Sequence, residues 1–397
     1  MAPWEKVWIK LPRSGNIGDL DDHLKYLKCV DCHKGNPKQA NNKEEAHKGL
    51  VPDPSEYTLL NDKLTNSCDG ADCHGEGSNL DKSGYKNSLH QQLWGEKRMV
   101  ALRSGASSFE TCPQTLQNGF NGECTSCHAT CGDCHISIPN SAGKGLVSSH
   151  RFKKTPNMEK NCTACHGSRI AHDFYGDEDA GRKGDVHYAK HYMDCFDCHS
   201  GEEMHKAVSD KDNTNRYNYE HRPTCEDCHA GLDTLNTYHS IHLEKTSCYV
   251  CHAGSTPGYN NCNKCHVAGE WKNDPEYKEV EGFKIGINPL KSDERPYNFT
   301  TLRHIPVART TYDNWGGTGL LVDYDKFETW KHATPHSIQR WTAQTDTTGG
   351  KTCSENCHLK DGKIYLFEDY INTNWPDEVQ ANKNVVVDGR LPTWWSK

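Results

Sequence analysis

Apolar residues are sparse along this chain and stand singly or in short groups between polar stretches. A helix-like spacing of apolar residues occurs only in short pieces such as Asp22–Cys29 and Ala180–Cys195, separated by runs rich in Gly, Asn, Asp, Ser and Lys. Alternating apolar and polar residues predict short strands at Phe283–Ile287 and Lys363–Phe367. The pattern therefore predicts irregular coil with short helices, little regular sheet and no repeat of fixed period.

Composition makes a conventional hydrophobic core doubtful. Leu, Ile, Val and Phe together are only about 15% of the 397 residues, below the level at which a charged chain usually folds. Mean hydropathy is −0.90, and no apolar run approaches the roughly 20 residues that a membrane-spanning helix needs. The chain nevertheless contains 21 Cys and 24 His, so these residue types are the candidates for ordering it.

The cysteines fall into pairs, and a histidine directly follows the second cysteine of every pair. Eight pairs have the form C-x-x-C-H: Cys29/Cys32/His33, Cys124/Cys127/His128, Cys131/Cys134/His135, Cys162/Cys165/His166, Cys195/Cys198/His199, Cys225/Cys228/His229, Cys248/Cys251/His252 and Cys262/Cys265/His266. Two pairs have a longer gap: Cys68/Cys73/His74 is C-x4-C-H, and Cys353/Cys357/His358 is C-x3-C-H. Cys112 stands outside the pairs; we expect a buried free thiol, with an intermolecular disulfide as the alternative.

C-x-x-C-H is the attachment motif of c-type haem. Its two thiols add to the vinyl groups on one edge of the porphyrin, and the adjacent His becomes the proximal iron ligand. Disulfides or zinc sites would explain paired cysteines but not a His after all ten pairs; for Cys353 and Cys357 a C-terminal disulfide stays open. We therefore expect about ten covalently attached haem c groups, whose apolar rings replace the missing core, and an unfolded haem-free chain.

The histidines outside the motifs are the candidate distal iron ligands. They are His23, His47, His90, His150, His172, His187, His191, His205, His221, His239, His242, His304, His332 and His336. We expect about ten of them to ligate iron, since only five Met are available. Iron held between two His is low-spin and has no open position, so it passes electrons without binding a substrate. His23, which precedes Cys29, could ligate a local haem or a haem of another subunit.

Composition also divides the chain after His266. Residues 1–266 form an expected haem-rich domain with nine motifs. Residues 267–397 form a Trp-rich C-terminal region with a haem-free stretch, 267–352, and the tenth motif at 353–358. We expect this region to pack Trp and Tyr on haem faces and to return distal ligands to the haem domain, with a substrate-binding module as the alternative. The predicted fold class is a multihaem cytochrome c, mostly coil with short helices wrapped around a haem chain, with some short strands in the C-terminal part.

The net charge and the first ten residues of the chain indicate which partners and which location to expect. The formal net charge is −8, and haem propionates would make the loaded chain more negative. This argues against nucleic acid or an anionic membrane surface as a partner. The opening residues MAPWEKVWIK contain no apolar signal sequence. We expect an exported, mature protein that is extracellular or on the cell surface, with the periplasm as the alternative.

The motifs resemble those of the multihaem c-type cytochromes of metal- and mineral-respiring microbes. The runs Asn236-Thr-Tyr-His-Ser-Ile-His242 before CYVCH and His187-Tyr-Ala-Lys-His191 before CFDCH are similar to that group's arrangement of a distal His leading into the next motif. The resemblance covers residues 29–266 and 353–358. Some members, of the OmcS and OmcE type, polymerise into extracellular filaments, or nanowires, in which an N-terminal His of one subunit ligates a haem of the next. The resemblance implies this inter-subunit role for His23.

These observations predict an electron-transfer protein rather than an enzyme. We expect electrons to pass through a chain of about ten bis-His haems, in extracellular respiration, to redox partner proteins, minerals or other cells, with self-association into a filament. The alternative is a multihaem reductase or oxidoreductase of small nitrogen or sulfur oxyanions. Such an enzyme needs one iron with an open position, and we would expect it at the stretched motifs, Cys68–His74 and Cys353–His358.

Overall fold

The computed structural model describes residues 12–39, 41–60, 63–125, 129–179, 181–210, 222–254, 282–358, 364–371 and 376–391. The chain forms two compact units, which are described separately. Unit 1 comprises residues 1–93, 126–165 and 200–209, and unit 2 comprises residues 94–125, 166–199 and 210–397. This division differs from the one expected after His266, because several motif-bearing segments group with the C-terminal region.

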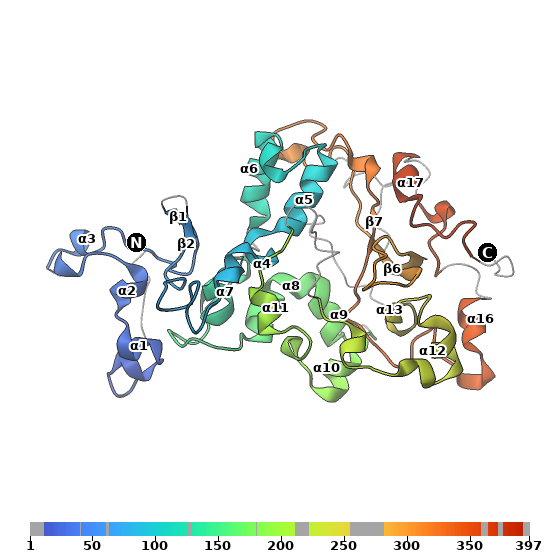
Figure 1. Cartoon of the computed structure of the whole chain (residues 1–397), viewed down its shortest axis with the longest axis horizontal. Coiled ribbons are helices and arrows are strands. Elements are labelled where there is room, and N and C mark those ends of the chain that lie inside the picture. The colour runs from blue at the N-terminus through green and yellow to red at the C-terminus, as the bar shows by residue number, and fades with distance from the viewer. Residues whose placement is uncertain are drawn as a thin grey trace. The chain divides into compact units, whose positions relative to one another are not determined.

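Unit 1 contains short helices and two two-stranded sheets (Figure 1). Its helices are α1 (His23–Tyr26), α2 (Cys29–His33), α3 (Lys43–Ala46), α4 (Leu89–Gln92), α7 (Cys131–His135) and α11 (Gly201–His205), and α8 (Thr163–His166) lies at its edge. The antiparallel pairs are β1 (Thr58–Leu60) with β2 (Lys63–Thr65), and β3 (Ser137–Ile138) with β4 (Gly145–Leu146). Two helices replace the single one suggested by Asp22–Cys29, because Leu27 has an extended backbone between α1 and α2.

Unit 2 contains the longest helices described and a three-stranded sheet. The helices are α5 (Trp94–Arg103), α6 (Gln114–Glu123), α9 (His172–Tyr175), α10 (Val186–His191), α12 (Thr237–His242), α13 (Cys248–His252), α16 (Cys353–Cys357) and α17 (Pro376–Asn382). The sheet joins β5 (Phe283–Ile287), β6 (Phe299–His304) and β7 (Trp330–His332), all antiparallel, with β6 in the middle.

The structure confirms the coarse prediction of helix and coil with little sheet. The strand predicted at Phe283–Ile287 is confirmed as β5. The strand predicted at Lys363–Phe367 is wrong over its described residues, which make a single bridge from Tyr365 to Ile285; Lys363 itself lies outside them. Two backbone hydrogen bonds make this bridge, from Ile285 N–H to the Ile364 carbonyl (2.7 Å) and from Leu366 N–H to the Ile285 carbonyl (2.9 Å), and the side chains of Tyr365 and Ile285 also pack in one hydrophobic cluster.

Unit 1 has almost no hydrophobic core of its own. Among the side chains described in this unit, the buried hydrophobic ones are Leu20 and Tyr85. Hydrogen bonds hold part of it together: the buried amide of Asn161 donates to the carbonyl oxygens of Asp133 and Ser137, at 2.6 and 2.7 Å. Burial of so few apolar side chains offers little of the free energy that folding normally requires. Side chains alone therefore do not account for the folding of unit 1.

Unit 2, in contrast, has a conventional core around its sheet. One cluster is made by Leu302, Trp330, Leu366, Ile371, Val385 and Val386, and a second by Val250, Ile285, Tyr365, Phe367 and Val387. Gly286 is required for the first, because a Cβ at Gly286 would lie 2.2 Å from Cδ1 of Leu302. The expectation that haem rings replace the aliphatic core is therefore wrong for this region. Its buried Trp330 packs among aliphatic side chains and stacks on the ring of His304.

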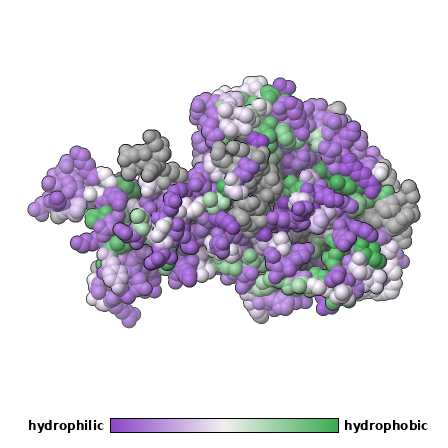
Figure 2. All heavy atoms as spheres, in the orientation of Figure 1, coloured by the Kyte–Doolittle hydropathy of each residue, from purple (hydrophilic) through white to green (hydrophobic). Residues whose placement is uncertain are grey.

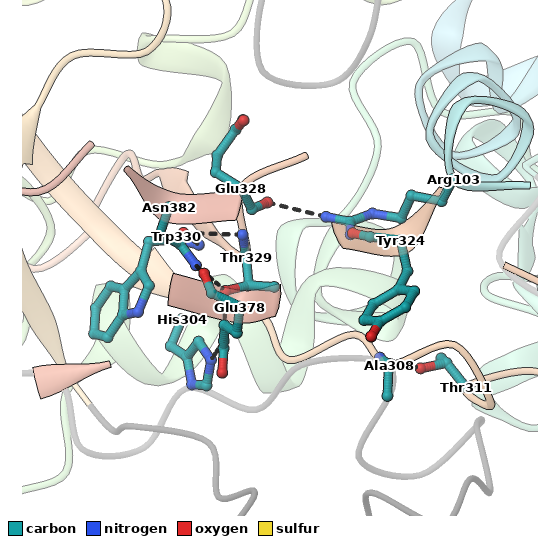
Figure 3. A network of polar contacts seen from close by, with 10 residues as sticks. All are labelled: Arg103, His304, Ala308, Thr311, Tyr324, Glu328, Thr329, Trp330, Glu378 and Asn382. Carbon is teal, nitrogen blue, oxygen red and sulfur yellow. Dashed lines mark hydrogen bonds and ion pairs between the residues drawn. The ribbon is translucent and has the colours of Figure 1, made fainter. Parts of the chain in front are cut away.

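A buried polar network ties α17 to the neighbourhood of β6 and β7 (Figure 3). The Oδ1 of Asn382 accepts hydrogen bonds from the backbone N–H groups of Thr329 (3.1 Å) and Trp330 (2.9 Å). Its Nδ2 donates to the Thr329 hydroxyl and to the Glu378 carbonyl, both at 2.8 Å. Glu378 Oε1 in turn accepts from the Thr329 hydroxyl at 2.6 Å and lies 2.7 Å from Nε2 of His304.

Replacing Asn382 should show how much this network stabilises unit 2. We expect Asn382→Ala to lower the free energy of unfolding by roughly 3 kcal/mol, because two buried N–H groups lose their acceptor. Chemical denaturation followed by tryptophan fluorescence measures this. Asn384→Ala, at an exposed site two residues further on, is the matched control and should change stability by less than about 0.5 kcal/mol. Equal stabilities of both variants and the parent would contradict a stabilising network.

The exposed surface is largely polar. On the face drawn in Figure 2, hydrophilic residues predominate, with small hydrophobic areas between them. Within the residues that the structure describes, no helix combines the length and apolar content needed to cross a bilayer. This agrees with the expectation of no membrane span.

Candidate haem-ligand sites

Most described C-x-x-C-H motifs fold as a single helical turn. The helices α2, α7 and α13 each consist of the five motif residues. The motifs beginning at Cys195 and Cys225 start with a tighter 3-10 turn. One turn brings the two cysteines and the His of a motif onto neighbouring positions of the same short segment, as covalent attachment followed by iron ligation requires.

An acidic side chain inside the motif explains why these turns form. In five motifs an acidic side chain between the two cysteines accepts a hydrogen bond from the backbone N–H of the residue just before the first Cys. In four of them the acidic residue directly precedes the second Cys, and in the stretched motif it lies two residues before it. The pairs are Asp31 with Lys28 (2.6 Å), Asp133 with Thr130 (2.9 Å), Asp197 with Asp194 (2.7 Å), Asp227 with Thr224 (2.7 Å) and Glu355 with Thr352 (2.6 Å). This contact is one half of a capping box. Its sequence signal is an acidic residue between the cysteines, which our sequence analysis did not use.

Counted over the described residues, the structure brings the rings of seven motif histidines close to the rings of seven histidines from outside the motifs. The ring centres of the pairs lie 5.9 to 6.5 Å apart. In unit 1 the pairs are His33–His150 (6.2 Å), His74–His23 (6.4 Å) and His135–His205 (6.0 Å). In unit 2 they are His199–His336 (6.5 Å), His229–His187 (5.9 Å), His252–His239 (6.2 Å) and His358–His242 (6.0 Å).

This spacing fits one metal ion between the two rings of each pair. An imidazole nitrogen lies about 2 Å from a metal that it ligates, so two rings on opposite sides of one ion have centres roughly 6 Å apart. A directly stacked pair of rings would be closer in many cases, since stacked centres start near 4.5 Å. Every pair also combines one motif His with one other His, as expected for a proximal and a distal ligand.

The other ring nitrogen of most paired histidines is held by the protein. Nδ1 of nine of these histidines hydrogen-bonds to an oxygen acceptor. Six of them donate to a backbone carbonyl oxygen: His33 to Val51 (2.9 Å), His74 to Leu80 (3.1 Å), His135 to Lys153 (2.6 Å), His252 to Gln339 (3.1 Å), His242 to Tyr238 (2.7 Å) and His336 to Thr334 (2.9 Å). Two bond to a carboxylate oxygen: His23 to Asp21 (2.7 Å) and His187 to Asp185 (2.9 Å). The carbonyl of Gly201 accepts from His205. A proton on Nδ1 leaves the lone pair on Nε2, the state in which histidine ligates a metal.

Burial also keeps several of these rings neutral. Desolvation lowers the pKa of His336 to about 4. It likewise lowers the pKa of His150, His205, His252 and His358 from the ordinary value. A neutral imidazole retains the lone pair that a metal needs, so these rings can ligate at neutral pH without first losing a proton.

The motif thiols form two linear series, one in each unit. In unit 1, Cys32 interacts with Cys73, Cys68 with Cys131, and Cys134 with Cys162. In unit 2, Cys198 interacts with Cys228, Cys225 with Cys248, and Cys251 with Cys353. The pairs Cys68–Cys131 and Cys225–Cys248 are within hydrogen-bonding reach. In each interior motif one thiol therefore faces the preceding motif and the other thiol faces the next.

His23 lies beside a motif of its own chain. Its ring faces that of His74 in unit 1, and Asp21 holds its Nδ1. Of the two roles that the sequence left open for His23, the structure favours the local one. The stretched motif at Cys68–His74 thereby has a second histidine, and so does the other stretched motif, since His358 faces His242 from α12.

His304 has a different role from the expected distal ligand. Its Nε2 lies 2.7 Å from Glu378 Oε1, both side chains are buried, and its ring stacks on Trp330. A carboxylate therefore engages the nitrogen that would ligate iron. The expectation that His304 is a distal iron ligand is corrected accordingly. In His332, by contrast, Nε2 is buried and has no hydrogen-bond partner within the described part of the chain.

The other expected ligands are not brought into the seven pairs. His47, His90, His172 and His191, and the motif histidine His166, lie in described segments but outside these pairs. Cys124 and Cys165 form no disulfide among the described residues and are partly exposed. His221, Cys127, His128, Cys262, Cys265 and His266 lie outside the described residues.

The cysteines considered for disulfides form none among the described residues. Cys353 and Cys357 are not joined to each other. Cys112 is buried, and its Sγ lies 3.4 Å from the hydroxyl of Ser104. Burial raises the pKa of the Cys112 thiol, which suits the buried free thiol that we expect at this position.

The comparisons with known proteins leave these sites to be judged on their own geometry. No protein-family model matches the chain, and neither a curated protein nor a solved structure is detectably similar to it.

Proposed function

We propose that this protein transfers electrons through a chain of c-type haems, each held between two histidines. The observation that carries the proposal is the set of seven pairs in which a motif His faces a non-motif His with ring centres about 6 Å apart. The cysteine pairs supply the attachment, and the acidic caps hold five of the motifs in one turn. Bound haem supplies a reversible one-electron change at iron.

The two thiol series support a relay rather than isolated centres. In each interior motif one thiol interacts with the motif before it and the other thiol interacts with the motif after it. Groups attached at such thiols are neighbours, so an electron crosses short gaps within a unit. We infer the order 29–33, 68–74, 131–135, 162–166 in unit 1, and the order 195–199, 225–229, 248–252, 353–358 in unit 2.

The same pairs bear on the alternative of an oxyanion reductase. Such an enzyme requires an iron with an open position. The stretched motifs were the expected places for it, yet His74 and His358 each face a second histidine. This favours electron transfer over substrate reduction at these two motifs.

We further propose an extracellular or surface location, with redox proteins or minerals as electron donors and acceptors. The motif content and the negative net charge support this. Self-association into a filament stays part of the proposal, and the position of His23 beside His74 of its own chain supports a local role for this histidine.

Electron paramagnetic resonance of the oxidised protein, with haem quantified on the same sample, tests the proposal. We expect low-spin bis-His signals that integrate to about ten haems per chain. A stoichiometric high-spin signal that changes on adding nitrite or sulfite would instead establish an open iron and support the reductase. A haem content far below the number of motifs would contradict both functions.

A further inference from the structure

Two arginines and one histidine of unit 2 gather in a largely buried position, where the only acidic side chain acting on Arg295 among the described residues is that of the neighbouring Glu294. They are Arg222, Arg295 and His332, which we call the buried cation cluster. Arg295 and His332 are only 3% and 5% exposed, and Arg222 is partly buried. Arg222 precedes the motif at Cys225, Arg295 lies in the turn between β5 and β6, and His332 ends β7. Segments far apart in the sequence thus bring these side chains together.

Several donor atoms of this cluster have no acceptor among the described residues. Nε and Nη2 of Arg222, Nε of Arg295 and Nε2 of His332 are all buried without a hydrogen-bond partner in the described part of the chain. The side chains act on one another: burial and then the charge of Arg222 lower the pKa of Arg295. Burial, Arg295 and Arg222 lower the pKa of His332 to about 3. Buried guanidinium groups that repel one another and lack acceptors are strongly unfavourable unless an anion accompanies them.

The surroundings place the cluster beside two attachment motifs. Tyr297 interacts with Arg222, Arg295 and Cys248, and the partly buried Tyr249 interacts with Cys225, Tyr297 and Arg222. Cys225 and Cys248 are the first cysteines of neighbouring motifs in the unit 2 series. An anion held by the two arginines would therefore lie close to the groups attached at these cysteines.

We propose that the buried cation cluster is a carboxylate-binding site that holds a haem propionate of unit 2. This inference rests on the proposed function. Haem carries two propionate carboxylates, and the planar fork of an arginine matches a carboxylate with two parallel hydrogen bonds. Free nitrite or sulfite shares this oxyanion chemistry, but a propionate is covalently tethered to a haem and needs no entry path into a buried site.

The site has a consequence for the potential of the haem it serves. Positive charge close to a haem disfavours the oxidised state, which carries one more positive charge than the reduced state. The cluster therefore raises the reduction potential of one haem in the unit 2 series above that of its neighbours. Arg222 and Arg295 would influence this haem in two ways: they would position its propionate carboxylate, and their positive charge would raise its reduction potential.

Spectroelectrochemical titration of Arg222→Gln and Arg295→Lys tests the assignment. Arg222→Gln removes a charge at the less buried position, and Arg295→Lys keeps the charge but removes the fork. We expect the reduction potential of one haem to fall in Arg222→Gln and to shift less in Arg295→Lys, while the other haems keep their potentials. The exposed Arg390→Gln, with the same loss of charge in unit 2, should leave every potential unchanged.

Additional measurements separate the sources of the anion. Haem content and spin state are measured for every variant, so that a chain without its haems refutes the proposed function rather than this site. With haems intact, unchanged potentials in both arginine variants would overturn the carboxylate site. Nitrite or sulfite that shifts the spectrum of the parent, but not of Arg222→Gln, would overturn the propionate assignment and identify a free oxyanion. No response to either anion, together with the potential shift, supports the propionate.

Discussion

A haem-free form of this chain should retain structure around β5, β6 and β7 and lose it in unit 1. Unit 2 has a side-chain core that includes Leu302, Trp330 and Val385, whereas unit 1 buries few apolar side chains among those described. The attached haems would supply the apolar surface that unit 1 lacks. This refines the expectation, drawn from composition alone, that the whole haem-free chain unfolds.

Hydrogen exchange followed by mass spectrometry can measure this on chain produced without haem attachment. We expect peptides of unit 1 to exchange at the rate of an unfolded chain, and peptides covering β5–β7 to exchange roughly a hundred times more slowly. The haem-loaded protein, protected in both units, is the control. Protection throughout unit 1 without haem would show that hydrogen bonds and polar contacts suffice to fold it. Exchange at the unfolded rate in both units would show that the unit 2 core also needs haem.

Removal of a single distal histidine should convert one haem of about ten from low-spin to high-spin. We expect this for His336→Ala, which empties the position facing His199, and for His242→Ala, which empties the position facing His358. Loss of the sixth ligand leaves iron with an open position and weakens its ligand field. Electron paramagnetic resonance with quantitative integration measures the change.

The matched control is His304→Gln. His304 is another buried histidine of unit 2, but Glu378 engages its Nε2, so its replacement should lower stability without creating high-spin iron. Added imidazole should restore the low-spin signal in His336→Ala by filling the space of the lost ring. Unchanged spin states in both alanine variants would contradict the ligand pairs. A high-spin signal in His304→Gln would show that His304 does ligate iron.

The candidate attachment motifs can be recognised in the sequence because each is a local feature. Two cysteines and a histidine within five to seven residues suffice for recognition, as at Cys29–His33. The short helices and the strand at Phe283–Ile287 also follow from local patterns, and they are present in the structure. The capping contact of Asp133 with Thr130 is equally local, so a search for acidic residues between the cysteines would have found it.

The ligand pairs could not be derived in this way. His336 meets His199 from more than a hundred residues away, and neighbouring His239 and His242 of one helix face different motifs, those of His252 and His358. The count of histidines showed that enough ligands exist, but not which one faces which motif. For His23 the resemblance implied a neighbouring subunit, whereas the fold places it at His74.

By itself, the sequence determined the attachment motifs, the supply of further histidines and the scarcity of apolar residues, because each depends on residue type and short spacing. The tertiary structure alone decided which histidines are paired, in what order the motif thiols follow one another, and where a side-chain core exists. It also decided that Arg222, Arg295 and His332 share one buried position. These features depend on contacts between distant segments, and such contacts form only when the packing and hydrogen bonding of the whole unit favour them.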